Sequence, residues 1–261
     1  MKEMKTVFDV QAEVGLTKHL GSLAATEELV KLCHILPGYK VLDVGSGAGR
    51  TPLDLAKRYD LRMVGVDIHP GMVAYARAQA EKHGLNGRVN FRQGDAQDLP
   101  FDDNTFDAVI VESVTVFTQD SQQAVNEYVR VVKPGGYVGM NESTFLQPDP
   151  PQAVRDWVSQ EVALGAQVYT AEGWKSFLDT AGLRDVFAKV YPLDVKKQAA
   201  ETVKRYGVGG ITRAMFRSLK MNVMYPEVRA ILKEGTSTYP ENMSDYFGYG
   251  LYVGRKPDRR S

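Results

Sequence analysis

The sequence predicts an α/β fold in which a mostly parallel β-sheet is covered on both faces by helices. Short apolar runs alternate with amphipathic helical patterns between about residues 20 and 145. The first of these runs ends in a glycine-rich turn that leads directly into a helical pattern. Such alternation indicates right-handed crossovers between parallel strands, which are buried on both faces and therefore continuously apolar.

The elements of this first region follow one another in order. Residues 22–36 have apolar positions near a 3.6-residue period and are predicted to be helical up to Pro37-Gly38. A helix is expected after the glycine turn, a second one starts at Pro70, and a third covers 124–132. Strands are predicted at residues 40–44, 62–67, 89–92, 106–111 and 137–141.

Beyond residue 145 the pattern changes, and its elements are predicted as follows. A proline-rich connector precedes a helix over 152–164, and Thr170 is expected to cap a helix that ends at Gly182. Residues 185–194 and 246–254 have strand character. Residues 196–235 are predicted to be helical, with breaks at Gly207, Gly209-Gly210 and Pro226.

We expect one domain over residues 1–261. Three segments exceed what the sheet and its helices need, and we expect them to cover the edge where the parallel strands end. These lid segments are 1–22, 146–169 and 196–245.

The composition is that of an ordinary globular protein. The 261 residues include 32 basic and 32 acidic side chains, so the formal charge is zero, with 43% hydrophobic and 25% charged residues. This balance argues against nucleic-acid binding through overall charge. The single cysteine, Cys33, excludes an internal disulfide, and we expect it to be a buried structural thiol. The four histidines have no metal-ligand spacing, so no metal is expected.

The N-terminal residues have no apolar stretch of the kind found in signal peptides. No window approaches the roughly 18 apolar residues of a membrane span. We therefore expect a cytoplasmic protein.

The glycine-rich turn predicts a ligand site. Glycine allows tight turns and close approach of a ligand to the backbone, and ligands of open α/β sheets bind at the carboxyl ends of the strands. The glycines stand at 45, 47 and 49, whereas the dinucleotide fingerprint would need one at position 50, which is arginine. The following Arg50-Thr51-Pro52 excludes a P-loop. A ligand without a pyrophosphate is favoured.

Two further strand ends carry carboxylates. Asp67 ends the second predicted strand, where it can accept both hydroxyls of a ribose, or alternatively cap the helix that starts at Pro70. Gly94-Asp95-Ala96 follows the third strand, where a carboxylate and a backbone N–H can contact an adenine edge, or alternatively form a simple turn.

Five ordered motifs resemble those of the class I S-adenosylmethionine (SAM)-dependent methyltransferases, and most closely their type 11 small-molecule branch. The resemblance covers about residues 20–145, with a looser match over 170–182. The motifs are Val41-Leu42-Asp43-Val44-Gly45-Ser46-Gly47-Ala48-Gly49, Val64-Gly65-Val66-Asp67-Ile68, Gly94-Asp95-Ala96-Gln97-Asp98-Leu99-Pro100-Phe101, Phe106-Asp107-Ala108-Val109 and Val132-Lys133-Pro134-Gly135-Gly136.

The resemblance implies a Rossmann-like, doubly wound sheet of seven strands with an antiparallel last strand and helical lid insertions. It also implies SAM as cofactor, S-adenosylhomocysteine as product and a small-molecule acceptor. Asp67 would hold the ribose, Ile68 and Met72 the adenine face, Asp95 and Ala96 the adenine edge. The other implied cofactor-binding residues are Asp43, Gly45, Ser46, Gly47, Gly49, Glu112 and Ser113.

Methyl transfer from a sulfonium needs alignment and exclusion of water, and a general base only where the acceptor must lose a proton. Glu112 is the best-placed candidate base, although it has the alternative of only binding SAM or substrate. His19 is a second candidate, with a surface position as its alternative. Tyr169 and Tyr206, in the expected lids, are weaker candidates.

Residues 195–220 contain seven cations and one acid, a local charge of +6. One interpretation is a lid helix that packs on the core and has a solvated basic face, with Val208, Ile211, Met215 and Leu219 at helical spacing. The other is recognition of an anionic or membrane-resident substrate through Arg213, Arg217 and Lys220, such as a lipid or quinone.

Three other functions compete with methyl transfer to a small molecule. The main alternative is a protein with the SAM-binding fold that binds or regulates without methyl transfer. A nicotinamide oxidoreductase is disfavoured by Arg50, and nucleic-acid methylation by Glu112-Ser113-Val114-Thr115 after the fourth strand. The sequence indicates neither the acceptor atom nor the oligomeric state.

Overall fold

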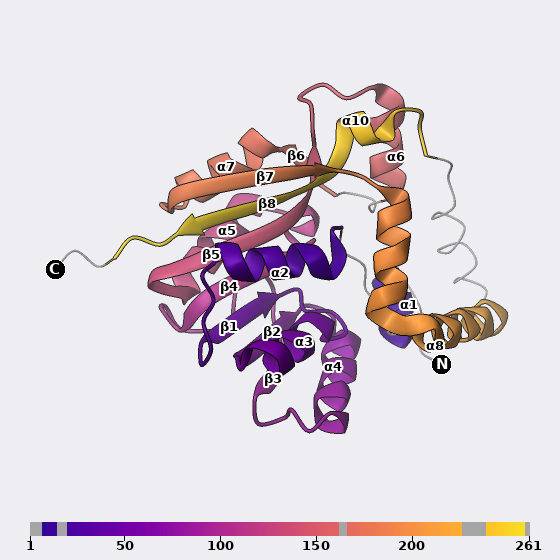
Figure 1. The fold of residues 1–261 in the computed structure, drawn as a ribbon, viewed down its shortest axis with the longest axis horizontal. Helices are drawn as coiled ribbons and strands as arrows, with labels where there is room; N and C mark the ends of the chain where they lie inside the picture. Colours follow the sequence, from indigo (N-terminus) through magenta and orange to yellow (C-terminus); the bar gives the residue numbers. More distant parts are fainter. Residues whose placement is uncertain (1–6, 15–19, 162–165, 226–238, 259–261) are drawn as a thin grey trace.

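The protein is described by a computed structural model that covers residues 7–14, 20–161, 166–225 and 239–258. A twisted sheet runs through it in the order β3-β2-β1-β4-β5-β8-β7, and β6 pairs with β5 beside this path (Figure 1). The strands are β1 (Lys40–Val44), β2 (Arg62–Asp67), β3 (Val89–Gln93), β4 (Phe106–Glu112), β5 (Val132–Phe145), β6 (Tyr169–Thr170), β7 (Arg184–Pro192) and β8 (Phe247–Arg255).

The doubly wound Rossmann-like sheet is confirmed. Strands β1 to β5 pair in parallel, and β8 runs antiparallel to both β5 and β7. The two-residue β6 is an addition to the seven predicted strands. The sequence 134–136 is an irregularity within β5 and not a turn before it, because β5 already pairs with β4 at Val132.

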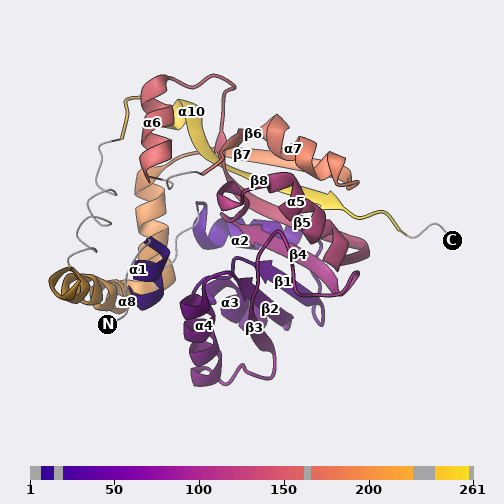
Figure 2. The ribbon, with the colours of Figure 1, turned by 180° about the vertical axis from the view of Figure 1, so that it is seen from behind.

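Helices lie on both faces of the sheet (Figures 1 and 2). Apolar side chains of α2, α3 and α4 form one core with Val41, Met63 and Ile110, while α5 and α7 form the other with Leu42, Val109 and others. The helices are α1 (Val7–Val14), α2 (Ser22–Leu32), α3 (Arg50–Tyr59), α4 (Pro70–Lys82), α5 (Ser121–Val131), α6 (Gln152–Glu161), α7 (Ala171–Thr180), α8 (Val195–Met224) and α10 (Met243–Tyr246), with a 3-10 turn η1 (Thr115–Phe117).

Local signals account for several helix boundaries. Thr170 accepts a hydrogen bond from the Gly173 N–H and caps α7, as predicted. Pro70 is the first residue of α4. Helix α2 is shorter than predicted and ends at Leu32, since His34 takes a left-handed backbone conformation with φ +47°. Cys33, directly after α2, is buried as expected, and burial raises the pKa of its thiol to about 12.

The described parts of the segments that we expect to act as lids include α1, α6 and α8. Helix α1 contacts α4 and α8, and α8 extends from the end of β7 past α2 to α1 (Figure 1). Helix α8 bends at Gly207 (φ +67°) and continues through Gly209-Gly210, where a break was predicted. The predicted break at Pro226 lies outside the described residues. Helix α6 packs through Val154 and Val158 near Phe247 of β8.

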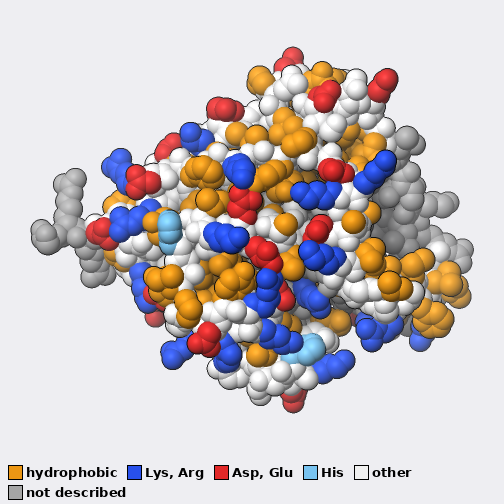
Figure 3. All heavy atoms as spheres, viewed as in Figure 1, with side chains coloured by type: hydrophobic (Ala, Val, Ile, Leu, Met, Phe, Trp, Pro, Cys, Tyr) orange, Lys and Arg blue, Asp and Glu red, His pale blue; other side chains and the backbone are white. Residues whose placement is uncertain are grey.

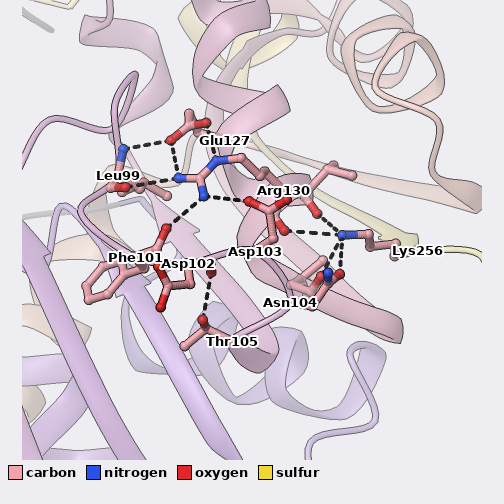
Figure 4. A network of polar contacts seen from close by, with 11 residues as sticks. Leu99, Phe101, Asp102, Asp103, Asn104, Thr105, Glu127, Arg130 and Lys256 are labelled. Carbon is pink, nitrogen blue, oxygen red and sulfur yellow. Dashed lines mark hydrogen bonds and ion pairs between the residues drawn. The ribbon is translucent and has the colours of Figure 1, made fainter.

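A partly buried polar network fixes the segment that follows β3 (Figure 4). Glu127 accepts a hydrogen bond from the Leu99 N–H, and Arg130 donates to the carbonyl oxygens of Leu99 and Phe101. Lys256, just after β8, donates to the Val129 and Val132 carbonyls at the end of α5. These bonds hold the loop after β3 against α5. Among the described residues, no helix is long and apolar enough to cross a membrane, and no cluster of potential metal ligands occurs.

Candidate cofactor and substrate site

The glycine-rich turn joins β1 to α3, at the point where the neighbouring β2 and β4 also end. Gly49 has φ +77°, and a Cβ there would lie 2.7 Å from the Phe91 ring and 2.8 Å from the Ala76 Cβ. Gly45 has φ +66°, and a Cβ there would lie 2.2 Å from a Val114 methyl group. A side chain at either position would push the turn away from the strand ends.

Asp67 lies at the tip of β2 and joins the turn to the start of α4. Its carboxylate accepts hydrogen bonds from the Gly47 N–H and the His69 N–H, both at 2.8 Å. Burial raises the pKa of Asp67, and these two bonds oppose the rise. The alternative in which Asp67 caps α4 is wrong, because the Nδ1 atom of His69 accepts from Gly71 and Met72.

The remaining predicted adenine contacts surround Asp67. Ile68 is 65% exposed, and Met72 is buried against Ala48 of the glycine turn. Asp95 accepts a hydrogen bond from the Gln97 N–H at 2.9 Å, so the segment does form a turn, in which Ala96 is half-buried. Gln93, at the end of β3, donates to the Ile68 carbonyl oxygen.

Glu112 lies at the tip of β4 and is held from two helices. Thr26 of α2 donates to its Oε1 atom at 2.8 Å, and Thr51 of α3 donates to Oε2 at 3.1 Å. Ser113 follows with φ +57°, and its N–H donates to the Asn141 carbonyl oxygen at 2.7 Å. The carboxylate is therefore oriented by two hydroxyl groups that the sequence gives no reason to place there.

Another carboxylate, the fully buried Glu142 of β5, was not predicted. Its Oε1 atom accepts from the N–H groups of Val114 and Thr115, so it caps the η1 turn that follows β4. The side chain is fully buried, and its Oε2 atom has no hydrogen-bond partner among the described residues. Burial raises the pKa of Glu142 to about 7, although bonds from the turn oppose this. The polar residues 141–144 at the end of an otherwise apolar strand were the available signal.

Two predicted residues of the first motif are buried. Asp43 of β1 is 3% exposed. The Ser46 hydroxyl lies against Gly65 of β2, and the Ser46 N–H donates to the Val66 carbonyl oxygen. The hydroxyl and N–H of Ser46 thus lie against β2, whereas its carbonyl oxygen accepts from the Gly49 N–H within the turn.

Helices α1 and α8 reach this edge through contacts that the sequence did not reveal. Asp9 of α1 bonds the Nε2 atom of His69 at 2.9 Å, two residues beyond Asp67. The Arg50 guanidinium stands over the Tyr206 ring of α8, 5.6 Å from its centre. Tyr169 packs edge-on against Trp174 and Phe177 instead. His19 lies outside the described residues.

Comparisons with known proteins find methyltransferases. Residues 42–140 match a family described as a methyltransferase domain. A phosphoethanolamine N-methyltransferase of Triticum aestivum is 30% identical over 169 residues, which are 65% of this chain and 32% of the relative. A sterol 24-C-methyltransferase of Gibberella zeae is 41% identical over 108 residues, 41% of this chain and 28% of the relative.

Residues 42–140 of this chain therefore form a methyltransferase domain of the class I SAM-dependent type. The cofactor of this family is SAM. The matched region spans about a third of the length of these two curated methyltransferases.

Two solved structures extend the likeness of this methyltransferase fold beyond the central motifs. The phosphoethanolamine N-methyltransferase 2 of Haemonchus contortus, with phosphomonomethylethanolamine and S-adenosylhomocysteine, superposes with a TM-score of 0.73 at 19% identity, covering 97% of this chain and 58% of that one. The [4+2]-cyclase SpnF gives 0.72 at 23% identity, covering 98% of each chain. At these identities the likeness is one of fold.

Proposed function

We propose that this protein transfers the methyl group of SAM to a small-molecule acceptor. The observation that carries the proposal is the pairing of the glycine turn with Asp67 at two adjacent strand ends. A carboxylate offers about four lone-pair positions. Two of those on Asp67 are used by backbone N–H groups, so capacity remains for the two hydroxyls of a ribose.

The neighbouring residues suit the rest of the cofactor. The exposed Ile68 side chain offers an apolar surface to the adenine face, with Met72 packed beside the turn. Asp95 and Ala96 lie after β3, where we assign them to the adenine edge. Asp43, Gly45, Ser46, Gly47 and Gly49 form the cradle for the methionyl part, in which Ser46 shapes the turn and its neighbours face the ligand.

Bound SAM supplies a methyl group on a positively charged sulfur, which is already an activated leaving group. The protein then has to orient the acceptor and exclude water. Glu112 and Ser113 lie at the adjacent strand end, where we place the methyl group. Because Thr26 and Thr51 donate to both carboxylate oxygens, Glu112 is held in one orientation. That suits a fixed negative charge near the sulfonium, and leaves the role of proton acceptor as the alternative.

The acceptor class remains broad. The named relatives include methyltransferases for phosphoethanolamine and for sterols, both small molecules. Helices α1 and α8 lie beside the candidate site and outside the matched residues 42–140, so we place the determinants of specificity there.

A second candidate function is a SAM-binding protein without methyl transfer. It is favoured by the fold similarity to SpnF, a protein named for a cyclisation and not for a transfer.

Calorimetric titration with SAM and S-adenosylhomocysteine tests the cofactor site. Wild type should bind both, and Asp67→Ala should weaken binding by about 100-fold, as expected for two hydrogen bonds to a charged group at about 1.5 kcal/mol each. Glu81→Ala, which removes an exposed carboxylate on α4, is the control. Equal affinity of wild type and Asp67→Ala would refute the assignment.

Transfer of an isotope-labelled methyl group to a panel of small acceptors separates the two candidate functions. Labelled product from any acceptor, absent without enzyme, supports the methyltransferase. Tight SAM binding with no product across phosphoethanolamine, sterol and quinol acceptors would favour the second candidate.

A further inference from the structure

The distal half of α8, residues 208–224, exposes large apolar side chains. The chain bends at Gly207, and beyond this point the helix projects from the body of the molecule (Figures 1 and 2). The exposed fractions are 71% for Val208, 66% for Met215, 71% for Phe216, 61% for Leu219 and 71% for Val223. Of the four apolar residues at helical spacing, Ile211 is half-buried, whereas the expectation that Val208, Met215 and Leu219 pack on the core is wrong.

These residues form a strip along one side of the helix. At 100° per residue, Val208, Met215, Phe216, Leu219 and Val223 fall within a sector of about 100°. The cations Arg213, Arg217 and Lys220 occupy the next sector of about 60°. Figure 3 shows hydrophobic side chains gathered over this end of α8, with basic side chains next to them. The helix thus has an apolar strip and a basic strip side by side.

The third side of the same helix holds it to the protein. Ala214 and Met221 are buried, and they fall on the side opposite the apolar strip. Arg217 donates to the Glu13 carbonyl oxygen of α1. The internal contacts of this half-helix are thus made by a face that leaves the apolar strip exposed.

We propose that residues 208–224 of α8 dock the protein onto the surface of a bilayer that contains anionic phospholipid. An interfacial helix combines an apolar strip, which enters the acyl boundary, with neighbouring cations that meet anionic headgroups. The half-helix has three cations and no acidic residue, as the nearest acids in the chain are Glu201 and Glu227. The positive charge of the half-helix therefore favours a negatively charged surface. A second copy of this chain is disfavoured, because pairing two apolar strips would also bring their neighbouring cations together.

The docking surface is connected to the candidate site. Tyr206, just before the bend, stacks with Arg50 at the start of α3, directly after the glycine turn. A bilayer bound by the distal half would lie next to the lid. The proposal does not rest on the proposed function, because vesicle binding is measured without turnover.

Sedimentation with sucrose-loaded vesicles tests the proposal on the full chain. Wild type should bind vesicles of 30% phosphatidylserine in phosphatidylcholine, bind pure phosphatidylcholine much more weakly, and lose affinity as salt increases. Arg213→Glu/Lys220→Glu should lower the partition coefficient at least about 25-fold, since each cation contributes about fivefold. Arg217 is left intact because it bonds α1. The matched control is Lys57→Glu/Lys82→Glu, which makes the same charge change at exposed positions elsewhere.

A second pair of variants tests the apolar strip. Phe216→Ser/Leu219→Ser should weaken binding by at least about tenfold, whereas Leu36→Ser/Val190→Ser, also at exposed positions, should not. Equal melting temperatures show that folding is preserved. No binding of wild type to the anionic vesicles, or equal loss in the charge control, would overturn the proposal. So would a dimer of wild type in sedimentation equilibrium that the strip variants convert to monomer, since the strip would then bind a second copy.

Discussion

At the scale of single residues, the candidate site contains carboxylates whose partners set their properties. Glu112 accepts hydrogen bonds from two threonines, whereas buried Glu142 accepts from backbone N–H groups through its Oε1 atom. Glu127, on α5, lies against Arg130, which lowers its pKa. Similar side chains in one protein thus have pKa shifts of opposite sign, and stability should depend on pH accordingly.

Glu142→Gln should stabilise the protein at alkaline pH. The pKa of Glu142 is raised from 4.5 to about 7 by burial. Between these two pH values the Glu142 carboxyl is ionised in the unfolded state and still protonated in the folded state. The contribution of Glu142 to the stability of wild type therefore falls as pH rises and is most unfavourable above about pH 7. The neutral amide of the glutamine avoids the cost of ionising a buried carboxyl, which is about 3 kcal/mol. Thermal melts should show the Glu142→Gln variant well above wild type at pH 8 and close to it at pH 4.5.

The control for this prediction is Glu127→Gln, for which the sign is reversed. Because the pKa of Glu127 is lowered in the folded protein, ionised Glu127 stabilises the fold above the pKa of the unfolded state. This stabilisation is lost as pH falls. This variant should melt below wild type at neutral pH and approach it in acid. A constant difference between Glu142→Gln and wild type from pH 4.5 to 8 would contradict the buried charge.

At the scale of elements, the N-terminal helix α1 is attached to the cofactor edge through His69. Nδ1 of His69 accepts from two backbone N–H groups, so its Nε2 atom carries the proton and donates to Asp9. This bond, formed between mostly buried side chains, links α1 to the residue that caps α4. Arg217 of α8 holds the same helix through Glu13.

Asp9→Ala should loosen α1 and weaken SAM binding. Loss of the partly buried hydrogen bond between Asp9 and His69 costs about 1 kcal/mol of interaction free energy. The affinity for SAM should therefore fall about fivefold. Hydrogen exchange should speed up at the amides of α1, while those of β1 remain protected. Glu13→Ala is the control on the same helix, because it retains the carbonyl that Arg217 contacts. Unchanged exchange in α1 after Asp9→Ala would show that this bond does not fasten the helix.

At the scale of the whole molecule, one sheet extends from β3 to β7 and carries a hydrophobic core on each face. Strand β5 lies between β4 and β8, and the C-terminal β8 lies between β5 and β7. Residues from the beginning and end of the chain therefore share the same packing, which favours a single cooperative unit.

Calorimetry should accordingly show one unfolding transition for residues 1–261. The calorimetric enthalpy should equal the van't Hoff enthalpy, as for a two-state domain. S-adenosylhomocysteine at 100 times its dissociation constant should stabilise the protein by about 2.7 kcal/mol and raise the melting temperature. Two separate transitions, with only one sensitive to ligand, would indicate that the segment 146–261 unfolds independently.

Patterns that depend on near neighbours were predictable. The glycine turn, Pro70 at a helix start and the Thr170 cap are each defined by a few adjacent residues, and all three occur in the structure. The alternative in which Asp67 caps α4 failed by two residues, because His69 is the residue that accepts from the Gly71 and Met72 N–H groups.

Contacts between distant segments were not predictable. Thr26 meets Glu112 across 86 residues and Asp9 meets His69 across 60, and no local pattern encodes such pairs. The sequence by itself determined the order of strands and helices, the glycine turn and the acidic strand ends, because periodicity and turn chemistry are local. Only the tertiary structure decided which side of α8 packs and which partners orient the carboxylates, because burial depends on how the whole chain comes together.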